Sequence, residues 1–378
     1  MNKPIYPFYL DLSDDEIVEL QSDYRDIIKS GKLILGPFTE RFENNFRDYI
    51  GTKYAVAVST GTSALEILCR IHHFEGKKVA VPTNTNFASV AAIIRANGIP
   101  VYLDMSKEYF QPTLEMVVNA HRIEGISAVM WVHIAGIIIP DFIEIVDYCK
   151  KNGLILIEDC AHAHGSQLNG IKAGAFADGG AFSFFPTKVM TTSEGGMITL
   201  NDEDGNHLAR SFRNQGKRNQ DYGNHHTDFG NSWRISEIAA SMGFVQLRKL
   251  DKMIRTRQNA VDAIVPVLEK YQVKYCQTSH MDKASHYKFI ILFNDLFSKE
   301  RCIDSLKSKC IIVGGGVYET PCHFQPVFNN IPLPIGGLPA AEKYCPLHMC
   351  LPITSGLNNK DIEYMTHGLA EAFSSNAS

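Results

Sequence analysis

Apolar side chains near the start of the chain recur every three or four residues, which is the spacing of one helix face. Between Asp14 and Ser30 these positions are Ile17, Val18, Leu20, Tyr24, Ile27 and Ile28. Gly31 follows directly and is a natural end for such a helix. The pattern therefore predicts a helix over residues 14–30, and a second one from Thr39 to Tyr49, before Gly51.

The pattern then changes to short apolar runs separated by helix-length stretches. The runs predict strands at Tyr54–Val58, Lys78–Val81, Val101–Asp104, Ala128–Val132 and Leu154–Glu158, with two more at Phe182–Phe184 and Met197–Leu200. Helices are predicted in the stretches between them, at Ser63–His72, Phe87–Asn97 and Asp141–Lys151. Strands that alternate with helices indicate an α/β fold with a parallel sheet. Ligands of such sheets bind beyond the carboxyl ends of the strands.

The rest of the chain is predicted to form a second, smaller domain. A long helical stretch from Ser236 to about Leu268 leads to a strand at Tyr287–Leu292 and to helices near Ser298–Lys307, Pro339–Tyr344 and Lys360–Phe373. A length of 378 residues suits two domains. We expect a large domain over residues 1–250, with an N-terminal helical segment, and a smaller C-terminal α+β domain over residues 251–378.

Charge and composition exclude several classes of protein. The 37 Lys and Arg against 41 Asp and Glu give a formal charge of −4. A chain without basic surplus is not expected to bind nucleic acid. The sequence contains neither a membrane-length apolar run nor an apolar leader at its start, so we expect a cytoplasmic protein without a membrane partner. The nine cysteines are scattered without a CxxC pair, which predicts reduced thiols and no metal site.

A run of small and hydroxyl side chains follows the first predicted strand and opens the next helix. It reads Ser59-Thr60-Gly61-Thr62-Ser63-Ala64. Free backbone N–H groups at a helix start, together with hydroxyl groups, bind phosphate and other anions. A helix cap by Ser or Thr is the ordinary alternative.

Two further features carry possible chemistry. The buried strand at residues 154–158 ends in Glu158-Asp159, and a carboxylate there can pair with a cationic ring nitrogen or a metal, or simply cap the next turn. Lys188 ends the run Phe184-Phe-Pro-Thr-Lys188 in a loop rich in hydroxyl groups and glycine. A lysine in such surroundings is a candidate for a Schiff base, because burial near other cations frees its amine as a nucleophile. A solvated loop lysine is the alternative.

The three features together fit pyridoxal 5'-phosphate (PLP). Its phosphate needs N–H donors, its ring nitrogen needs an anion and its aldehyde needs an amine. Lys188 follows Asp159 by 29 residues. Few other small cofactors require all three groups at once.

The sequence resembles the DegT/DnrJ/StrS family of sugar aminotransferases, which are fold-type I PLP enzymes. The motifs that carry the resemblance span nearly the whole chain; they are Leu35-Gly36-Pro37, Ser59-Thr60-Gly61-Thr62-Ser63-Ala64, Glu158-Asp159-Cys-Ala-His162, Ser183-Phe-Phe-Pro-Thr-Lys188, Glu194-Gly195-Gly196, Trp233-Arg234 and Pro321-Cys-His323-Phe-Gln325-Pro326. The resemblance implies a mostly parallel central sheet covered by helices in the large domain.

The resemblance also implies roles for individual residues. Lys188 matches the Schiff-base lysine, which also moves a proton between the substrate carbon and the cofactor. Asp159 matches the partner of the pyridine nitrogen, and His162 the residue that binds the phenolic oxygen. The phosphate-binding positions are Gly61, Thr62 and Ser183.

The family forms homodimers that share their active sites. An Asn of the partner subunit, two residues before a conserved Arg, completes the phosphate site, and the position is Ser232 here. A serine can still donate one hydrogen bond. Gly36 and His323 are expected near the substrate, and the tract Gln215–His226 is expected to be a mobile loop that reaches the neighbouring active site.

Two departures from the family pattern affect the pocket. The family carries an aromatic residue that stacks on the cofactor ring, but the strict register puts Asn86 in this place and Phe87 one residue late. One residue rotates a helical side chain by about 100°. We therefore expect Asn86 to be the neighbour of the ring, with weaker stacking. Ala135 stands where the family has a bulky residue, which leaves more room.

The resulting hypothesis is a PLP-dependent aminotransferase. It transfers an amino group from an amino acid, expected to be glutamate, to a keto group, expected on a nucleotide-linked keto-deoxysugar in polysaccharide or antibiotic biosynthesis. Alternatives are a small phosphorylated ketone as acceptor, a PLP-dependent sugar dehydratase, and a non-catalytic regulatory relative. The dehydratases have His in place of the lysine, so Lys188 disfavours them. A nicotinamide dehydrogenase is disfavoured because no GxGxxG follows an early strand.

Overall fold

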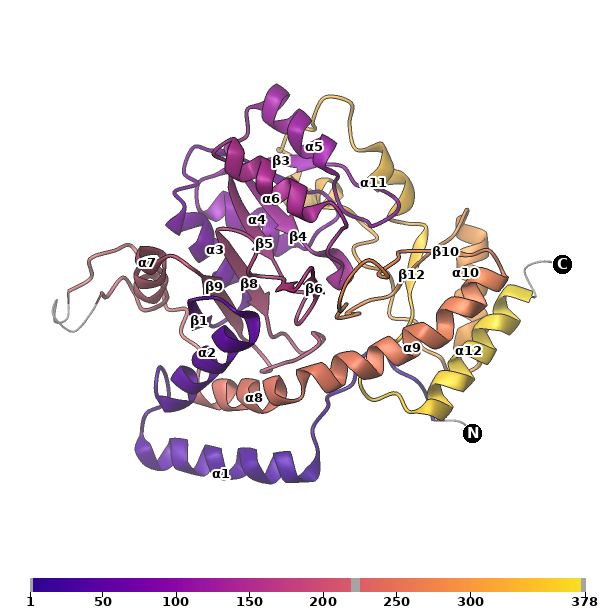
Figure 1. Cartoon of the computed structure of the whole chain (residues 1–378), viewed down its shortest axis with the longest axis horizontal. Coiled ribbons are helices and arrows are strands. Elements are labelled where there is room, and N and C mark those ends of the chain that lie inside the picture. Colours follow the sequence, from indigo (N-terminus) through magenta and orange to yellow (C-terminus); the bar gives the residue numbers. More distant parts are fainter. Residues whose placement is uncertain (1–2, 219–224, 375–378) are drawn as a thin grey trace.

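The computed structural model describes residues 3–218 and 225–374, in an α/β arrangement (Figure 1). The helices are α1 (Asp14–Ser30), α2 (Pro37–Ile50), α3 (Gly61–Ile71), α4 (Phe87–Arg95), α5 (Leu114–Asn119), α6 (Phe142–Lys151), α7 (Glu203–Arg213), α8 (Glu237–Arg248), α9 (Leu250–Lys270), α10 (Leu296–Ser308), α11 (Pro339–Tyr344) and α12 (Asn359–Ser374). The strands are β1 (Tyr54–Val58), β2 (Lys78–Pro82), β3 (Ile99–Leu103), β4 (Ala128–Val132), β5 (Ile155–Asp159), β6 (Gln167–Leu168), β7 (Ile171–Lys172), β8 (Gly179–Ser183), β9 (Gly196–Leu200), β10 (Lys274–Tyr275), β11 (Ile290–Leu292) and β12 (His348–Cys350).

The central sheet has seven strands in the order β1-β9-β8-β5-β4-β2-β3. All neighbours from β3 to β8 pair in parallel, and β9 alone runs against the others, between β1 and β8. The carboxyl ends of β5, β4 and β8 therefore meet at one edge. The predicted fold class is confirmed, because apolar runs buried on both faces form the parallel part of the sheet.

Helices cover both faces of this sheet. Phe42 and Phe46 of α2 pack on one face with α6 and α8, around the fully buried Trp131 of β4. On the other face, α3, α4 and α7 bury Leu68, Ile93 and Ala209. Each helix presents its apolar stripe to the sheet, which is why the 3.6-residue periodicity could be read from the sequence.

Local signals fix the helix ends near the amino terminus. Ser13 and Glu16 form a capping box at the start of α1, and Gly31 ends the helix in a left-handed conformation with φ 69°. The start of α2 is held from a distance. The carboxylate of Glu237 accepts hydrogen bonds from the backbone N–H groups of Gly36, Phe38 and Thr39.

A second sheet with the order β10-β11-β12 is antiparallel and packs with α9, α10 and α12. Ile5 pairs with Ile311 and lies in this core, whereas Cys322 and Phe328 pack against the central sheet. The N-terminal end of the chain thus contributes to the core around the second sheet, and a segment of its C-terminal part contributes to the core of the central sheet. The domain boundary near residue 250 stays a prediction.

The structure differs from the sequence prediction in several places. The single long helix expected from Ser236 is two helices, because Lys249 leaves helical geometry with φ −114° and ψ 8°. The strand expected from Tyr287 begins only at Ile290. Elements that were not predicted are helices α5 and α7 and strands β6, β7, β10 and β12. Residues 219–224 of the expected loop at Gln215–His226 lie outside the described residues.

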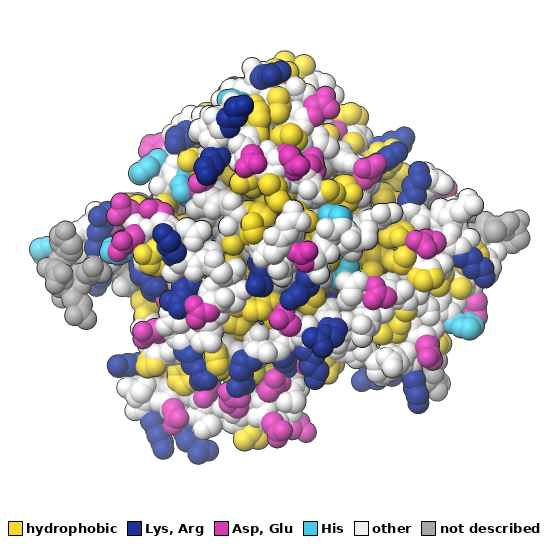
Figure 2. All heavy atoms as spheres, in the orientation of Figure 1, with side chains coloured by type: hydrophobic (Ala, Val, Ile, Leu, Met, Phe, Trp, Pro, Cys, Tyr) yellow, Lys and Arg dark blue, Asp and Glu magenta, His cyan; other side chains and the backbone are white. Residues whose placement is uncertain are grey.

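The surface carries both signs of charge. Figure 2 shows Lys and Arg side chains interspersed with Asp and Glu over the visible face, in line with the small net charge. Within residues 3–218 and 225–374, no helix combines the length and the apolar character that crossing a membrane requires.

Candidate active site

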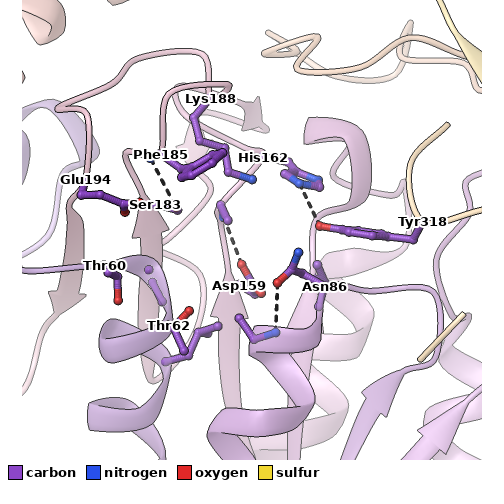
Figure 3. Close-up of a pocket in the computed structure, with 16 residues that line it drawn as sticks. Thr60, Thr62, Asn86, Asp159, His162, Ser183, Phe185, Lys188, Glu194 and Tyr318 are labelled. Atoms are coloured by element: carbon purple, nitrogen blue, oxygen red, sulfur yellow. Dashed lines mark hydrogen bonds between the residues drawn. The ribbon is translucent and has the colours of Figure 1, made fainter. Parts of the chain in front are cut away.

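A pocket of about 360 Å³ opens at the carboxyl ends of the central strands (Figure 3). Small-ligand sites usually enclose about 300–1,000 Å³, so its volume suits a small ligand. It brings together seven of the predicted site residues, namely Gly61, Thr62, Asn86, Asp159, His162, Ser183 and Lys188. Glu194 and Tyr318 also line it.

One side of the pocket is the first turn of α3. Thr60 caps this helix, and its side chain accepts a hydrogen bond from the N–H of Ser63 at 3.0 Å. The N–H groups of Gly61 and Thr62 have no acceptor within the described part of the chain. A Cβ atom at Gly61 would stand 2.6 Å from the Cβ of Ser183, so glycine is needed where this helix meets the end of β8. The arrangement can bind an anion such as a phosphate group.

Asp159 is the last residue of β5 and its carboxylate is buried in the floor of the pocket. One carboxylate oxygen accepts a hydrogen bond from the Ser89 hydroxyl at 2.8 Å, and the other from the Ala161 N–H at 3.1 Å. Burial raises the pKa of Asp159 above its ordinary value, although these bonds and the charge of Lys188 oppose the rise. No described cation forms an ion pair with it. A cationic group in the pocket would therefore find an uncompensated carboxyl group.

The neighbouring Glu158 points away from the pocket and has a structural environment. Its carboxylate accepts N–H bonds from Gly174, Phe176 and Ala177 and contacts Nε2 of His133 at 2.9 Å. The adjacent acids thus have different surroundings, because successive strand residues face opposite sides of the sheet.

Lys188 lies on the loop after β8, with its amine on the pocket side (Figure 3). Its Nζ stands 4.7 Å from the ring centroid of Tyr287, and the Nζ of Lys288 stands 5.6 Å from the same ring. Burial favours a raised pKa for Tyr287, but the cations Lys188, Lys288 and Arg257 bring the pKa below its ordinary value. The aromatic ring therefore lies between cations, close to the amine that the sequence singles out.

His162 is held at both ring nitrogens. The backbone N–H of Ala135 donates to Nδ1 at 3.3 Å, and the Tyr318 hydroxyl lies 3.1 Å from Nε2. The ring also stacks on Tyr287, with centroids 4.2 Å apart. Burial and the charges of Lys188 and Lys288 hold the pKa of His162 well below its ordinary value, so the imidazole is neutral. Its expected bond to a phenolic oxygen stays a prediction.

Asn86 lines the pocket and Phe87 does not, as the register predicts. Asn86 caps α4, accepts a hydrogen bond from the Ala88 N–H at 3.0 Å and lines the pocket. Phe87 instead stacks on Phe328, with centroids 5.4 Å apart. Because Phe87 is engaged elsewhere, it does not supply the missing aromatic wall.

The other three predicted residues lie outside this pocket. Ser232 is exposed and accepts a hydrogen bond from the Arg234 guanidinium at 2.5 Å. Gly36 sits at the start of α2 against Glu237. His323 contacts the Thr83 hydroxyl at 2.6 Å and the Glu342 carboxylate at 3.5 Å, so it ties the segment after Tyr318 to the end of β2.

Tyr318 was not identified from the sequence. It lies 156 residues beyond His162 and reaches the pocket from the C-terminal part of the chain. No spacing rule connects positions so distant. Its sole local signal is the neighbouring Pro321-Cys-His323 motif.

Solved structures of other proteins share this fold. The crystal structure of DesV from S. venezuelae superposes with a TM-score of 0.89 at 25% sequence identity, over 98% of this chain and 99% of that one. A structure from Streptococcus pneumoniae described in its PLP-form gives a TM-score of 0.87 at 23% identity, over 99% of each chain.

Residues 14–370 match the family model described as the DegT/DnrJ/EryC1/StrS aminotransferase family, and the chain belongs to this family. Among characterised relatives, the GDP-perosamine synthase of Escherichia coli O157:H7 is 30% identical over 346 residues, which are 90% of this chain and 91% of that protein. The resemblance stated from the motifs is thereby confirmed, and the protein is an aminotransferase.

Proposed function

We propose that this aminotransferase uses PLP to move an amino group from an amino acid, with glutamate as the expected donor, to a nucleotide-linked keto-deoxysugar. The observation that carries the proposal is the pocket itself: an amine, a buried carboxyl group and a helix start with free N–H groups line one cavity. Family membership supports the reaction class.

The residues present fit PLP on three counts. Gly61 and Thr62 line the pocket at a helix start, and their N–H groups have no acceptor among the described residues, as a phosphate requires. Asp159 is a buried carboxyl group without a cationic partner in the described chain, as a pyridinium nitrogen requires. Lys188 brings its amine to the same cavity. The similar structure described in its PLP-form supports this assignment.

PLP, when bound, supplies an aldehyde that carries the amino group and a ring that draws electrons from the reacting carbon. Lys188 would hold the aldehyde and, once released, its Nζ would take and return the proton of the substrate carbon. Asp159 would keep the ring nitrogen protonated, since a buried carboxylate is stabilised by an adjacent positive charge. Neutral His162, whose two ring nitrogens bond Ala135 and Tyr318, would line the cofactor site without adding charge. The Ser183 hydroxyl would donate a hydrogen bond to the phosphate.

The acceptor is inferred from a relative. A protein named GDP-perosamine synthase aligns with nine-tenths of this chain, and its name refers to a nucleotide-linked amino sugar. A nucleotide-linked keto-deoxysugar of polysaccharide or antibiotic biosynthesis is thus the proposed acceptor class, and a small phosphorylated ketone is the alternative to test.

We also propose a cytoplasmic homodimer whose subunits share the active site. Ser232 is exposed and lies outside its own pocket, so it is available to a second copy. An exposed apolar groove between α1 and α8 includes Tyr24 and Ile238, and it also includes Glu194, which lines the pocket. A second copy seated on this groove would reach the pocket edge. Sedimentation should give twice the 42.2 kDa chain mass, and a 42.2 kDa species would contradict the dimer.

Half-reactions test the proposed function. Glutamate should convert the PLP-loaded protein to its amino form, with loss of the visible absorption band. Keto sugars linked to GDP, dTDP or UDP, and phosphorylated ketones as the competing class, are then screened for return of the band. Return with a nucleotide-linked keto sugar supports the proposal. No return with any keto sugar, but return with a phosphorylated ketone, contradicts the acceptor class.

A further inference from the structure

Two residues with unusual backbone conformations hold His162 from opposite sides. Ala135 has φ 60° and Tyr318 has φ 56°, a left-handed region that side chains other than glycine rarely adopt. Such strain persists only where surrounding contacts impose it, and it concentrates at functional sites. Here it brings the Ala135 N–H to Nδ1 of His162 and the Tyr318 hydroxyl to Nε2.

The bond from Ala135 determines which nitrogen of His162 carries the proton. Nδ1 accepts the backbone N–H, so it is the unprotonated nitrogen. A neutral imidazole then has its proton on Nε2. The Nε2–H group must donate to the Tyr318 oxygen, which lies 3.1 Å away (Figure 3).

Asn86 imposes the same direction from the other side. Its Oδ1 accepts the Ala88 N–H as the cap of α4, which leaves the amide N–H groups to face Tyr318. The Asn86 side chain acts to lower the pKa of Tyr318, as a donor directed at the oxygen does. The Tyr318 oxygen thus accepts the Nε2–H of His162 and has the amide N–H groups of Asn86 as its other neighbour.

A hydroxyl group whose polar neighbours are both hydrogen-bond donors can only donate its own proton elsewhere. No acceptor for that proton occurs among the described residues, and Tyr318 lines the pocket. We propose that Tyr318 is a hydrogen-bond donor of the active site, aimed by His162 and Asn86 at an oxygen atom of the bound ligand. Burial raises the pKa of Tyr318 well above its ordinary value, so the hydroxyl keeps the proton that it donates.

The proposal rests on the proposed function, which offers two such oxygens. One is the phenolic oxygen of PLP and the other is the keto oxygen of the acceptor. Both are hydrogen-bond acceptors. They are distinguished by whether the loss of the Tyr318 hydroxyl weakens PLP binding or slows the reaction with the acceptor.

The first experiment compares Tyr318→Phe with the wild type in two arms. In one arm, the protein freed of PLP is titrated with PLP, and the visible band is followed against pH. In the other, the amino form reacts with the keto acceptor. Loss of one hydrogen bond is expected to weaken one arm about three- to tenfold. A weaker titration or a shifted pH profile identifies the phenolic oxygen, and a slower acceptor step with unchanged PLP binding identifies the keto oxygen.

Tyr364→Phe is the matched control. The Tyr364 hydroxyl donates to the Lys309 carbonyl in the C-terminal core, far from the pocket in the fold, so its removal costs a comparable bond without touching the ligand. It should match the wild type in both arms. A Tyr318→Phe protein that also matches the wild type in both arms overturns the role of Tyr318 alone. A wild type that takes up no PLP overturns the proposed function together with it.

A second pair of variants tests the aiming of the proton. Asn86→Ser keeps a helix cap but removes the amide donor, whereas Asn86→Asp keeps the cap and presents an acceptor to Tyr318. The aspartate should draw the Tyr318 proton to itself, so Asn86→Asp is expected to reproduce the Tyr318→Phe defect and Asn86→Ser to show a smaller one. In a Tyr318→Phe background, changing Asn86 to Asp should add little. A full additional defect there contradicts the mechanism.

Discussion

The floor and the wall of the pocket are built in different ways. The floor consists of Asp159, Ser183 and the start of α3, all at ends of strands in one sheet. The wall at Tyr318 comes from the C-terminal part of the chain, and the contact of the nearby His323 with Thr83 helps to attach it. The floor is fixed by strand pairing, whereas the wall is held by isolated contacts, such as this one and the bond from the Cys322 N–H to the Thr83 carbonyl at 2.7 Å. We therefore expect cofactor chemistry to depend on the floor and the fit of the ligand to depend on the wall.

The largest effect is expected at Lys188. Lys188→Ala should lose the visible band of lysine-bound PLP and about 10²–10⁴-fold in turnover, the usual contribution of a residue that transfers protons. Lys288→Ala is the comparison, because both amines face the ring of Tyr287. It should retain the band. Loss of the band from both variants would mean that the position of Lys188 is not special.

Variants of the two acids at the end of β5 should affect different properties, namely cofactor binding for Asp159 and thermal stability for Glu158. Asp159→Asn removes a charge-assisted hydrogen bond worth about 1.5–3 kcal/mol and should weaken PLP binding about 10- to 100-fold with little loss of thermal stability. Glu158→Gln should lower the melting temperature, since its carboxylate accepts three backbone N–H groups, and should leave PLP binding unchanged. The opposite assignment of effects would contradict the division between the two acids.

Acid should destabilise both parts of the molecule through buried histidines. Burial lowers the pKa of His164 to about 3, and that of His286 and His348 to about 4. The unfolded chain binds these protons near pH 6.5 and the folded chain does not, so stability is full above about 6.5 and falls as the pH drops towards 4. Between pH 6.5 and 5 each such histidine lowers the free energy of unfolding by about 2 kcal/mol.

Urea unfolding at several pH values measures this loss. His164 packs between Phe182 and Phe184 beside the floor, and neither of its ring nitrogens has a hydrogen-bond partner among the described residues. His164→Met should therefore remove the contribution of one histidine to the pH dependence of the unfolding free energy. It should leave the unfolding free energy at pH 7 unchanged. An unchanged slope would show that His164 does not contribute.

The smallest effect on function is expected from the loss of the contact between Thr83 and His323, which helps to attach the wall. Thr83→Val removes the 2.6 Å contact with His323, a hydrogen bond worth about 0.5–1.5 kcal/mol. The acceptor KM should rise a few-fold, while the PLP titration should not move. A change in PLP binding with an unchanged KM would remove the distinction between floor and wall.

The floor could be predicted from the sequence because its signals are local. Helix α1 and strands β1 and β4 occur at the predicted residues, since periodicity and short apolar runs are set by neighbouring positions. Asp159 could be singled out because it directly follows a predicted strand, and Gly61 because it lies in the short turn after one. Parallel strand ends then necessarily meet at one edge.

The wall could not be predicted because its contacts are distant in sequence. Tyr318 meets His162 across 156 residues, and His323 meets Thr83 across 240. The break between α8 and α9 was missed for another reason, since Lys249 is an ordinary helix former and the change of direction there is a tertiary effect. Asn86 shows what register alone can give: it predicted which residue lines the pocket, but not that its amide meets Tyr318.

The central claim is that the amine at position 188 holds PLP above the carboxyl group at 159. Borohydride reduction of the PLP-loaded wild type, followed by peptide mass spectrometry, tests it most directly, because reduction makes a lysine–PLP link permanent. A single pyridoxyl adduct is expected, on the peptide that contains Lys188. An adduct on Lys288 or another lysine, or no adduct after PLP loading, would contradict it.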